Sequence, residues 1–189
     1  MGLLIDGKWS TTWHDTDKTE GRFVRETASF RNWITPDGIA GPTGKAGFSA
    51  ESGRYHLYVS HACPWAHRTM IFRHVKQLTR HISVSVVHPL MQENGWSFEK
   101  DAQATCDHLF GKYFLHEVYT NGHPKASGRV TVPMLWDKQT QKIVSNESSE
   151  IIRMFNSAFN EITGNHDDYW PVALRRDIEN VNQDIYDNI

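Results

Sequence analysis

The sequence predicts an α/β fold, and three features of its middle part support this prediction. Residues 54–60 alternate in side-chain character, and residues 82–87 form a second β-rich run. Between them Pro64 stands where a helix would begin, and apolar residues then recur at helical spacing up to Leu78. Two strands joined by a single helix normally pair in parallel, so residues 54–87 are expected to form a β-α-β unit.

The elements expected after this unit complete the pattern. Residues 108–119 are a possible helix, and residues 130–136 have the composition of a strand that Pro133 interrupts. A turn leads to a short strand at 142–145, and Asn146 is expected to cap the helix that follows. The order β-α-β, helix, β-β-α is that of a thioredoxin-like domain.

The chain divides into four expected segments, of which a thioredoxin-like domain at 54–160 is the largest. Residues 1–53 contain many Trp and Phe residues without a regular repeat, and they are expected to form a long N-terminal extension that packs onto this domain. Residues 161–172 are polar and turn-rich, which is typical of a linker. An amphipathic pattern occupies 173–189 and continues to the last residue, so it predicts the first helix of an incomplete all-α domain.

The composition limits the possible functions. Apolar residues make up 39% and charged residues 22% of the chain, values typical of a soluble globular protein and not of a disordered one. A formal net charge of −2 predicts no nucleic-acid partner. Neither an apolar run of about 18 residues nor an apolar signal segment is present, so we expect no membrane span and a cytoplasmic location.

Cys63 is the candidate catalytic group, and it is one of only two cysteines in the sequence. It follows a predicted strand and precedes Pro64, so its sulfur is expected at a helix N-terminus, where free backbone N–H groups stabilise a thiolate. The third residue after it is Ala66, so no neighbouring thiol is available for an internal disulfide, and an external thiol is the expected partner. The alternative is a buried structural cysteine.

Two further segments are candidate binding elements. A cis bond before Pro133 would leave the backbone N–H and C=O of Val132 to pair with an extended peptide, whereas a trans proline at a strand start is the simpler alternative. The helix opening at 146–150 offers the Ser148 hydroxyl and backbone N–H groups to a carboxylate, and Glu147 to an ammonium group. Ordinary helix capping explains the same residues equally well.

A metal site at Cys63 is not expected. His61 and His67 flank this cysteine, but the three residues span a strand end and a helix start, and no second ligand cluster accompanies them. The other cysteine, Cys106, has no helix-start context and is interpreted as a passive thiol.

Several segments together resemble one protein family. They are FRNW at 30–33, SHACPWAHR at 60–68, PLM at 89–91 with NGW at 94–96, RVTVP at 129–133 and SNESSEI at 145–151. On these segments the chain resembles, along essentially its whole length, the glutathionyl-hydroquinone reductases, which are the Xi class of glutathione transferases. The resemblance implies a thioredoxin-like glutathione-binding domain, followed by a helical domain that this chain is expected to carry only in truncated form.

The resemblance also implies a reaction. Cys63 would attack the sulfur of a glutathionyl-hydroquinone, release the hydroquinone and hold glutathione as a mixed disulfide, which a second glutathione resolves. Glutathione would be the co-substrate, without a metal, and full-length members are expected to be homodimers. The residues implied to hold glutathione are Trp96, Arg129, Val132, Glu147 and Ser148.

Two other functions stay open at this point. A conjugating glutathione transferase would add the thiol of glutathione to an electrophile, but such classes use a Ser or Tyr hydroxyl where this sequence has Cys63. A non-catalytic, truncated glutathione-binding fragment is the second alternative. It follows from the expectation that the helical domain, which supplies much of the hydroquinone pocket in the family, is missing after Ile189.

Overall fold

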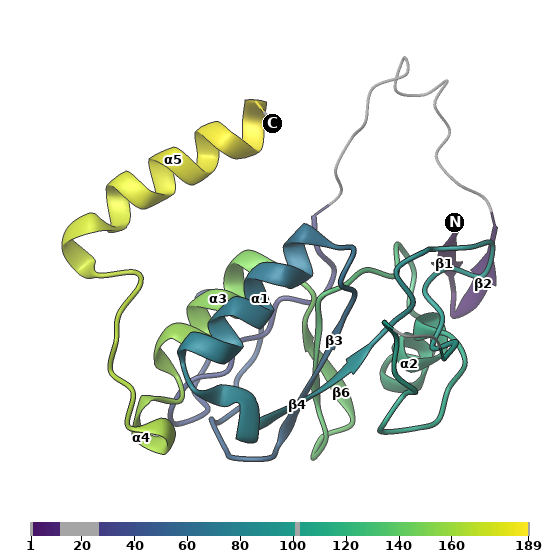
Figure 1. Cartoon of the computed structure of the whole chain (residues 1–189), viewed down its shortest axis with the longest axis horizontal. Helices are drawn as coiled ribbons and strands as arrows, with labels where there is room; N and C mark the ends of the chain where they lie inside the picture. Colours follow the sequence, from purple (N-terminus) through teal and green to yellow (C-terminus); the bar gives the residue numbers. More distant parts are fainter. Residues whose placement is uncertain (1, 12–26, 101–102, 189) are drawn as a thin grey trace.

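A mixed four-stranded sheet forms the centre of the protein in the computed structural model, which describes residues 2–11, 27–100 and 103–188 (Figure 1). The strands are β3 (Tyr55–Val59), β4 (Ile82–Val86), β5 (Met134–Asp137) and β6 (Lys142–Ser145). Their order across the sheet is β4-β3-β5-β6, with β4 parallel to β3 and β5 antiparallel to both β3 and β6. The predicted parallel pair is therefore confirmed.

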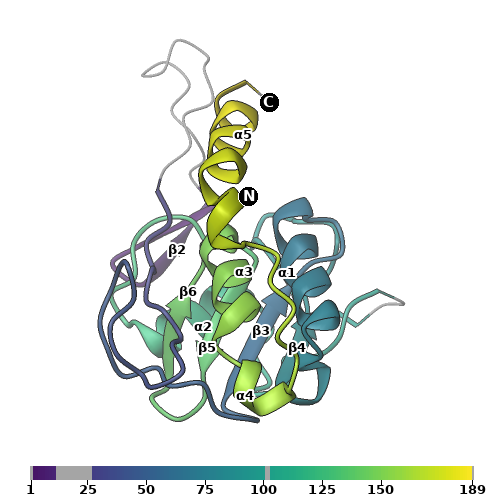
Figure 2. The ribbon, with the colours of Figure 1, turned by 90° about the vertical axis from the view of Figure 1, so that its left-hand side faces the viewer.

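Helices cover both faces of this sheet. They are α1 (Pro64–Val75), α2 (Leu115–Gly122) and α3 (Ser148–Ser157). Figures 1 and 2 show α1 and α3 side by side on one face, where Tyr55 of β3 contacts Phe159 just beyond α3. The other face carries Trp136 opposite His56, and α2 packs there. A Cβ at Gly122 would lie 2.6 Å from the Trp136 ring, so this close approach requires glycine.

The helix predicted at 108–119 forms instead over Leu115–Gly122, and Asp107 provides the physical reason. Its carboxylate accepts the Tyr58 hydroxyl at 2.9 Å and two backbone N–H groups of the following residues, which holds that segment in a turn. The helix begins after Phe114, whose backbone N–H donates to the Glu117 carboxylate at 2.8 Å and so caps the first turn.

Strand β3 is buried along its whole length, and it carries a histidine into the interior. The two ring nitrogens of His56 lie 2.7 Å from Ser83 Oγ and 2.9 Å from Ser85 Oγ. Burial lowers the pKa of His56 to about 3, so the ring is neutral in the folded protein. A neutral imidazole has one donor and one acceptor nitrogen, and the two serine hydroxyls satisfy both.

The N-terminal extension is fastened to the domain by backbone hydrogen bonds. It opens with a hairpin of two strands, β1 (Leu3–Ile5) and β2 (Lys8–Ser10). Leu4 exchanges two backbone hydrogen bonds of 2.9 Å with Gly128. Farther along, the Asn32 N–H donates to the Val144 carbonyl at 2.9 Å, which places this segment along the edge of β6. Residues 1 and 12–26 of the predicted extension lie outside the described residues.

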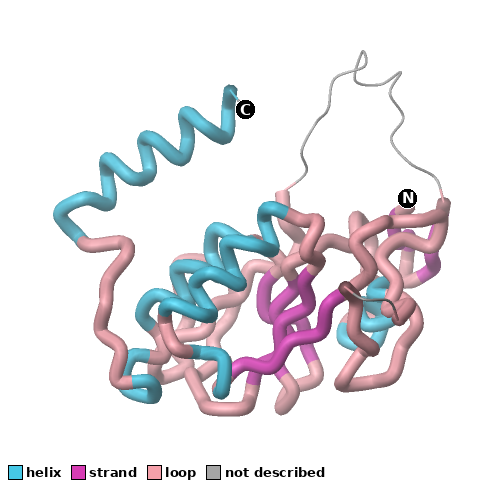
Figure 3. The backbone as a smooth tube through the Cα atoms, in the orientation of Figure 1, coloured by secondary structure: helices cyan, strands magenta, loops and turns pink. Residues whose placement is uncertain are grey.

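The remaining elements are η2 (Leu78–Arg80), α4 (Asn160–Thr163), η3 (Val172–Leu174) and α5 (Arg175–Asn188). Helix α5 stands apart from the sheet, and a loop leads to it (Figure 3). Helix α5 buries none of its residues. Arg153 of α3 donates to Glu179 of α5 at 2.8 Å, and the Cζ atoms of Arg153 and Arg175 lie 4.5 and 4.1 Å from the centroid of the Trp170 ring. The division of the chain into four segments after residues 53, 160 and 172 stays a prediction.

Among the described residues, none of the helices combines the length and the apolar character needed to cross a membrane.

Candidate functional site

Cys63 lies where β3 has ended and α1 begins. It caps α1 in an extended backbone conformation (φ −100°, ψ 115°), and Pro64 is the first helical residue. The His67 N–H donates to the Cys63 carbonyl at 3.0 Å, which closes the first turn. The side chain is partly buried, and its Sγ lies 3.4 Å from the carbonyl oxygen of Val132. The sulfur is therefore held between a helix N-terminus and the segment that leads into β5.

That segment contains a cis peptide bond between Val132 and Pro133. Tyr119 of α2 supports it from the interior: its hydroxyl donates to the Thr131 carbonyl at 2.9 Å and accepts the Thr131 N–H at 3.3 Å. Complete burial raises the pKa of Tyr119, so the hydroxyl stays protonated and can act as the donor. The backbone next to Cys63 is thus fixed by a side chain from a different layer of the fold.

Asn146 connects this segment to the N-terminal extension. Its Nδ2 donates to Thr131 Oγ1 at 3.1 Å, and its Oδ1 accepts the Phe30 N–H at 3.1 Å. The prediction that Asn146 caps the following helix is wrong, because its side chain is engaged in these contacts. Glu147 is the cap instead, and its carboxylate accepts the Ser149 N–H.

The first turn of α3 brings Glu147 and Ser148 next to α1. Glu147 Oε1 accepts the N–H of Ser149 at 3.0 Å and its hydroxyl at 2.8 Å. Ser148 Oγ accepts two hydrogen bonds from Arg68, one from Nε at 3.0 Å and one from Nη2 at 2.6 Å. The same Nη2 lies 3.9 Å from Glu147 Oε1. Arg68 therefore joins the helix that begins after Cys63 to the helix that carries both predicted binding residues.

Arg68 and Tyr119 are the two residues of this arrangement to which the sequence alone assigns no role. Arg68 belongs to the motif around Cys63, but its partner Ser148 is 80 residues away in the chain. The sequence does contain one signal for this contact: Arg68 is a cation one turn into α1, and the acidic helix opening at Glu147 is a possible partner for it. Tyr119 carries no comparable signal, because a tyrosine on the apolar face of a helix is usually a core residue.

Trp96 and Arg129, the other two predicted glutathione contacts, lie on separate loops. Trp96 is partly buried against the core, and its carbonyl accepts the Leu115 N–H at 2.9 Å at the start of α2. Arg129 is also partly buried and directly follows Gly128, which pairs with the N-terminal hairpin. Their role in holding glutathione stays a prediction.

The described ranges contain no cluster of three His, Cys, Asp or Glu side chains arranged as a metal site. His61 and His67 are both exposed. Cys63 and Cys106 are both free thiols, and Cys106 is the more exposed of the two.

Residues 62–158 match the family described as glutathione S-transferase, N-terminal domain. The chain belongs to the glutathione S-transferase family. The match begins just before Cys63 and ends just after α3, so it includes the contacts of Val132, Glu147 and Ser148 described above.

Individual relatives narrow the class of transferase. The chain is 56% identical over 190 residues to glutathionyl-hydroquinone reductase YqjG of Escherichia coli (strain K12), covering 100% of this chain and 58% of that protein. The glutathione-bound structure of YqjG matches with a TM-score of 0.87 at 52% identity, covering 100% of this chain and 56% of that one. A Xi-class glutathione transferase from Natrialba magadii matches with a TM-score of 0.84 at 41% identity, covering 100% and 55%.

These comparisons confirm the resemblance to the Xi class and the thioredoxin-like fold that the sequence predicts. The chain spans 58% of the length of the curated relative, YqjG, that it matches.

Proposed function

We propose that this chain carries the glutathione-binding half of a glutathionyl-hydroquinone reductase site, with Cys63 as the nucleophile. The observation that carries the proposal is the position of the Cys63 sulfur, at the N-terminus of α1 and 3.4 Å from the Val132 carbonyl. A helix N-terminus favours the thiolate, which is the nucleophilic form of cysteine. The 56% sequence identity to a protein named glutathionyl-hydroquinone reductase supports the proposed substrate class.

In the proposed reaction the Cys63 thiolate attacks the sulfur of a glutathionyl-hydroquinone. A sulfur–sulfur bond forms while the bond between that sulfur and the aromatic carbon breaks. The electron pair of the broken bond stays with the carbon, which takes up a proton to give the free hydroquinone. A glutathione thiolate then attacks the glutathionyl sulfur, releasing glutathione disulfide and restoring the Cys63 thiolate. Two glutathione sulfurs are oxidised, and the aromatic carbon is reduced.

The need for an external thiol follows from the surroundings of Cys63. The residue three positions later is Ala66, whose side chain is fully buried and carries no thiol. The second cysteine, Cys106, is exposed and unbonded. A mixed disulfide at Cys63 is therefore resolved by a second glutathione in this proposal.

The proposal also assigns the contacts of glutathione. The backbone of Val132 pairs with its cysteinyl part, Ser148 donates to the carboxylate of its γ-glutamyl part, and Glu147 accepts from the ammonium group. Trp96 and Arg129 complete the site. The convergence of Cys63 on Val132, and of Arg68 on the first turn of α3, supports this assignment. Homodimer formation by full-length members stays a prediction from the family resemblance, and a cytoplasmic location stays a prediction from the sequence.

A single-turnover experiment tests the proposal. The chain is mixed with one equivalent of a glutathionyl-hydroquinone, and both intact mass and released hydroquinone are followed. We expect one glutathionyl group on Cys63 together with one equivalent of hydroquinone, and neither product with Cys63→Ser. Cys106→Ser is the matched control and should behave like the unchanged chain.

Two results would overturn it. Hydroquinone release by Cys63→Ser at the original rate would remove Cys63 from the reaction. Formation of a glutathione conjugate from an added electrophile, with no adduct on the protein, would favour the conjugating alternative.

A further inference from the structure

The guanidinium group of Arg68 occupies a specific place between the two helices of the candidate site. Arg68 lies on α1, one turn after Pro64, and its side chain reaches across to the first turn of α3. Its planar group also lies over the Trp65 ring, with 4.9 Å between Cζ and the ring centroid. Such stacking restricts the guanidinium orientation, because the ring face attracts the cation.

The hydrogen bonds at Ser148 determine the direction of its hydroxyl. A serine oxygen has two lone pairs and one hydrogen. Arg68 Nε and Nη2 donate to Ser148 Oγ at 3.0 and 2.6 Å, so two donors meet the two lone pairs. An arginine cannot reverse these bonds, since it has no acceptor and stays protonated. The only remaining hydrogen-bonding capacity of Ser148 is its O–H, which can only donate.

The neighbouring carboxylate has the opposite character. Arg68 Nη2 and both donors of Ser149 approach Glu147 at its Oε1. Ser148 is 5% exposed and Glu147 is partly exposed, so both lie at the edge of the interior. A hydrogen-bond donor and an anionic acceptor therefore stand on consecutive residues, and the donor is set by an arginine from another helix.

We propose that Arg68 is a positioning residue that sets Ser148 as an obligate hydrogen-bond donor to the α-carboxylate of the γ-glutamyl group of glutathione. This inference rests on the proposed function, in which the first turn of α3 binds that group. Arg68 acts through Ser148, not by contact with the substrate. It thereby gives the site a preference for ligands that present a carboxylate at this point.

The experiment measures binding of two tripeptides to the full chain by calorimetry, with a phosphine reductant present to prevent mixed disulfides. One ligand is reduced glutathione. The other is γ-aminobutyryl-cysteinyl-glycine, which lacks only the α-carboxylate. We expect the unchanged chain to prefer glutathione by about 10- to 100-fold, the size of a hydrogen bond to a charged group.

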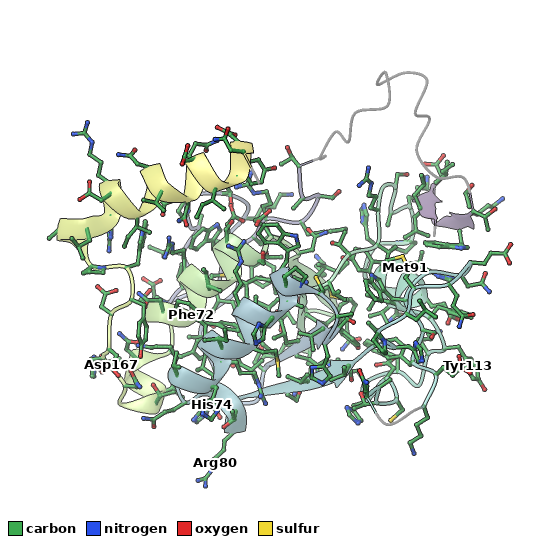
Figure 4. The ribbon with its side chains drawn as sticks, turned by 45° about the horizontal axis from the view of Figure 1, so that its top comes forward. Phe72, His74, Arg80, Met91, Tyr113 and Asp167 are labelled. Carbon is green, nitrogen blue, oxygen red and sulfur yellow. The ribbon has the colours of Figure 1, made fainter. Side chains whose placement is uncertain are left out.

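Variants then separate the roles of the two residues. Arg68→Met keeps the apolar stem on Trp65 but removes the donors, and it should reduce the preference at least several-fold. Ser148→Ala should abolish it, and the double variant should be no worse than Ser148→Ala alone. Arg68→Lys should retain part of the preference, because an ammonium group also donates to Ser148. Arg80→Met removes a cation that projects into solvent at the end of η2 (Figure 4) and should leave the preference unchanged.

The outcomes distinguish the inference from the proposed function. If the unchanged chain binds neither ligand, the proposed function and the inference both fail. If it prefers glutathione but Arg68→Met weakens both ligands equally, or adds its own loss to that of Ser148→Ala, the positioning role is overturned while the site stands. Melting temperatures of all variants report whether any loss reflects unfolding.

Discussion

The sulfur of Cys63 lies 3.4 Å from the carbonyl oxygen of Val132, although 69 residues separate them in the chain. Two independent sets of interactions create this contact. The junction of β3 and α1 delivers the sulfur, and the side chains of Tyr119 and Asn146 hold the backbone at Thr131. The thiol and its support can therefore be tested separately.

Cys63 should react faster than Cys106 with iodoacetamide at pH 6, by at least tenfold. Exposure alone predicts the reverse order, because Cys106 is the more exposed thiol. A helix N-terminus favours a nearby anion, and the thiolate is the form of cysteine that reacts. Pulse labelling followed by peptide mass mapping measures both rates. Equal labelling, or faster labelling of Cys106, would contradict a helix-stabilised thiolate.

Glu147→Gln should weaken glutathione binding by about tenfold or more, because an amide cannot pair with an ammonium group as a carboxylate does. The substitution keeps an oxygen acceptor for the Ser149 N–H, so α3 should stay capped. Glu161→Gln on α4 is the matched control, since it removes the same charge from an exposed position. Calorimetry with glutathione and with glutaryl-cysteinyl-glycine, which lacks the amino group, measures the effect. The ligand without the amino group should bind the unchanged chain and Glu147→Gln equally well. If Glu147→Gln weakened the binding of both ligands equally, Glu147 would be excluded as the ammonium contact.

Tyr119→Phe should lower the free energy of unfolding by about 1–3 kcal/mol, the usual cost of leaving buried polar groups without a partner. The lost hydroxyl donates to the Thr131 carbonyl at 2.9 Å and accepts from its N–H at 3.3 Å. Tyr113→Phe is the control, because Tyr113 is 80% exposed and projects from the surface (Figure 4). Urea unfolding measures both variants. A Tyr119→Phe chain as stable as Tyr113→Phe would show that this hydroxyl does not support the segment beside Cys63.

The stability of the protein should fall as the pH drops below about 6.5, in part because of His56. Its folded pKa is about 3, lowered by burial from an ordinary value of 6.5. Between these values the unfolded chain binds a proton that the folded state excludes, so folding loses up to about 1.4 kcal/mol per pH unit from this group. Above pH 6.5 both states are neutral at His56, and its contribution to the pH dependence vanishes.

Urea unfolding between pH 7.5 and 4.5 tests this expectation with two variants. His56→Gln offers the serines a neutral donor and acceptor, so it should remove that share of the slope even if the protein is less stable overall. His74→Gln removes an exposed histidine, and its slope should match that of the unchanged chain. An unaltered slope in His56→Gln would mean that another group carries the acid sensitivity.

Local chemistry in the sequence by itself determined the fold class and the position of the candidate nucleophile, Cys63, at the start of a helix. Pro64 after Cys63 determines where a helix starts, because helix initiation and capping act within a single turn. The alternation in residues 54–60 determines a strand, since side chains on a strand alternate between its two faces. The combined motifs also determine the family. Each of these features can be recognised in short segments of the sequence, without knowing which segments meet in the fold.

Only the tertiary structure decided which distant residues meet. The partners of Cys63 and Arg68 lie 69 and 80 residues away, and no periodicity encodes such contacts. Helix α2 begins later than the sequence predicts for a similar reason, because the Asp107 carboxylate accepts a hydrogen bond from Tyr58 of β3. The cap of α3 is Glu147 and not the predicted Asn146, because the Asn146 side chain is hydrogen-bonded to Thr131. A polar side chain forms hydrogen bonds with the groups that lie next to it in the folded protein, and the packing of the helices on the sheet determines which groups those are.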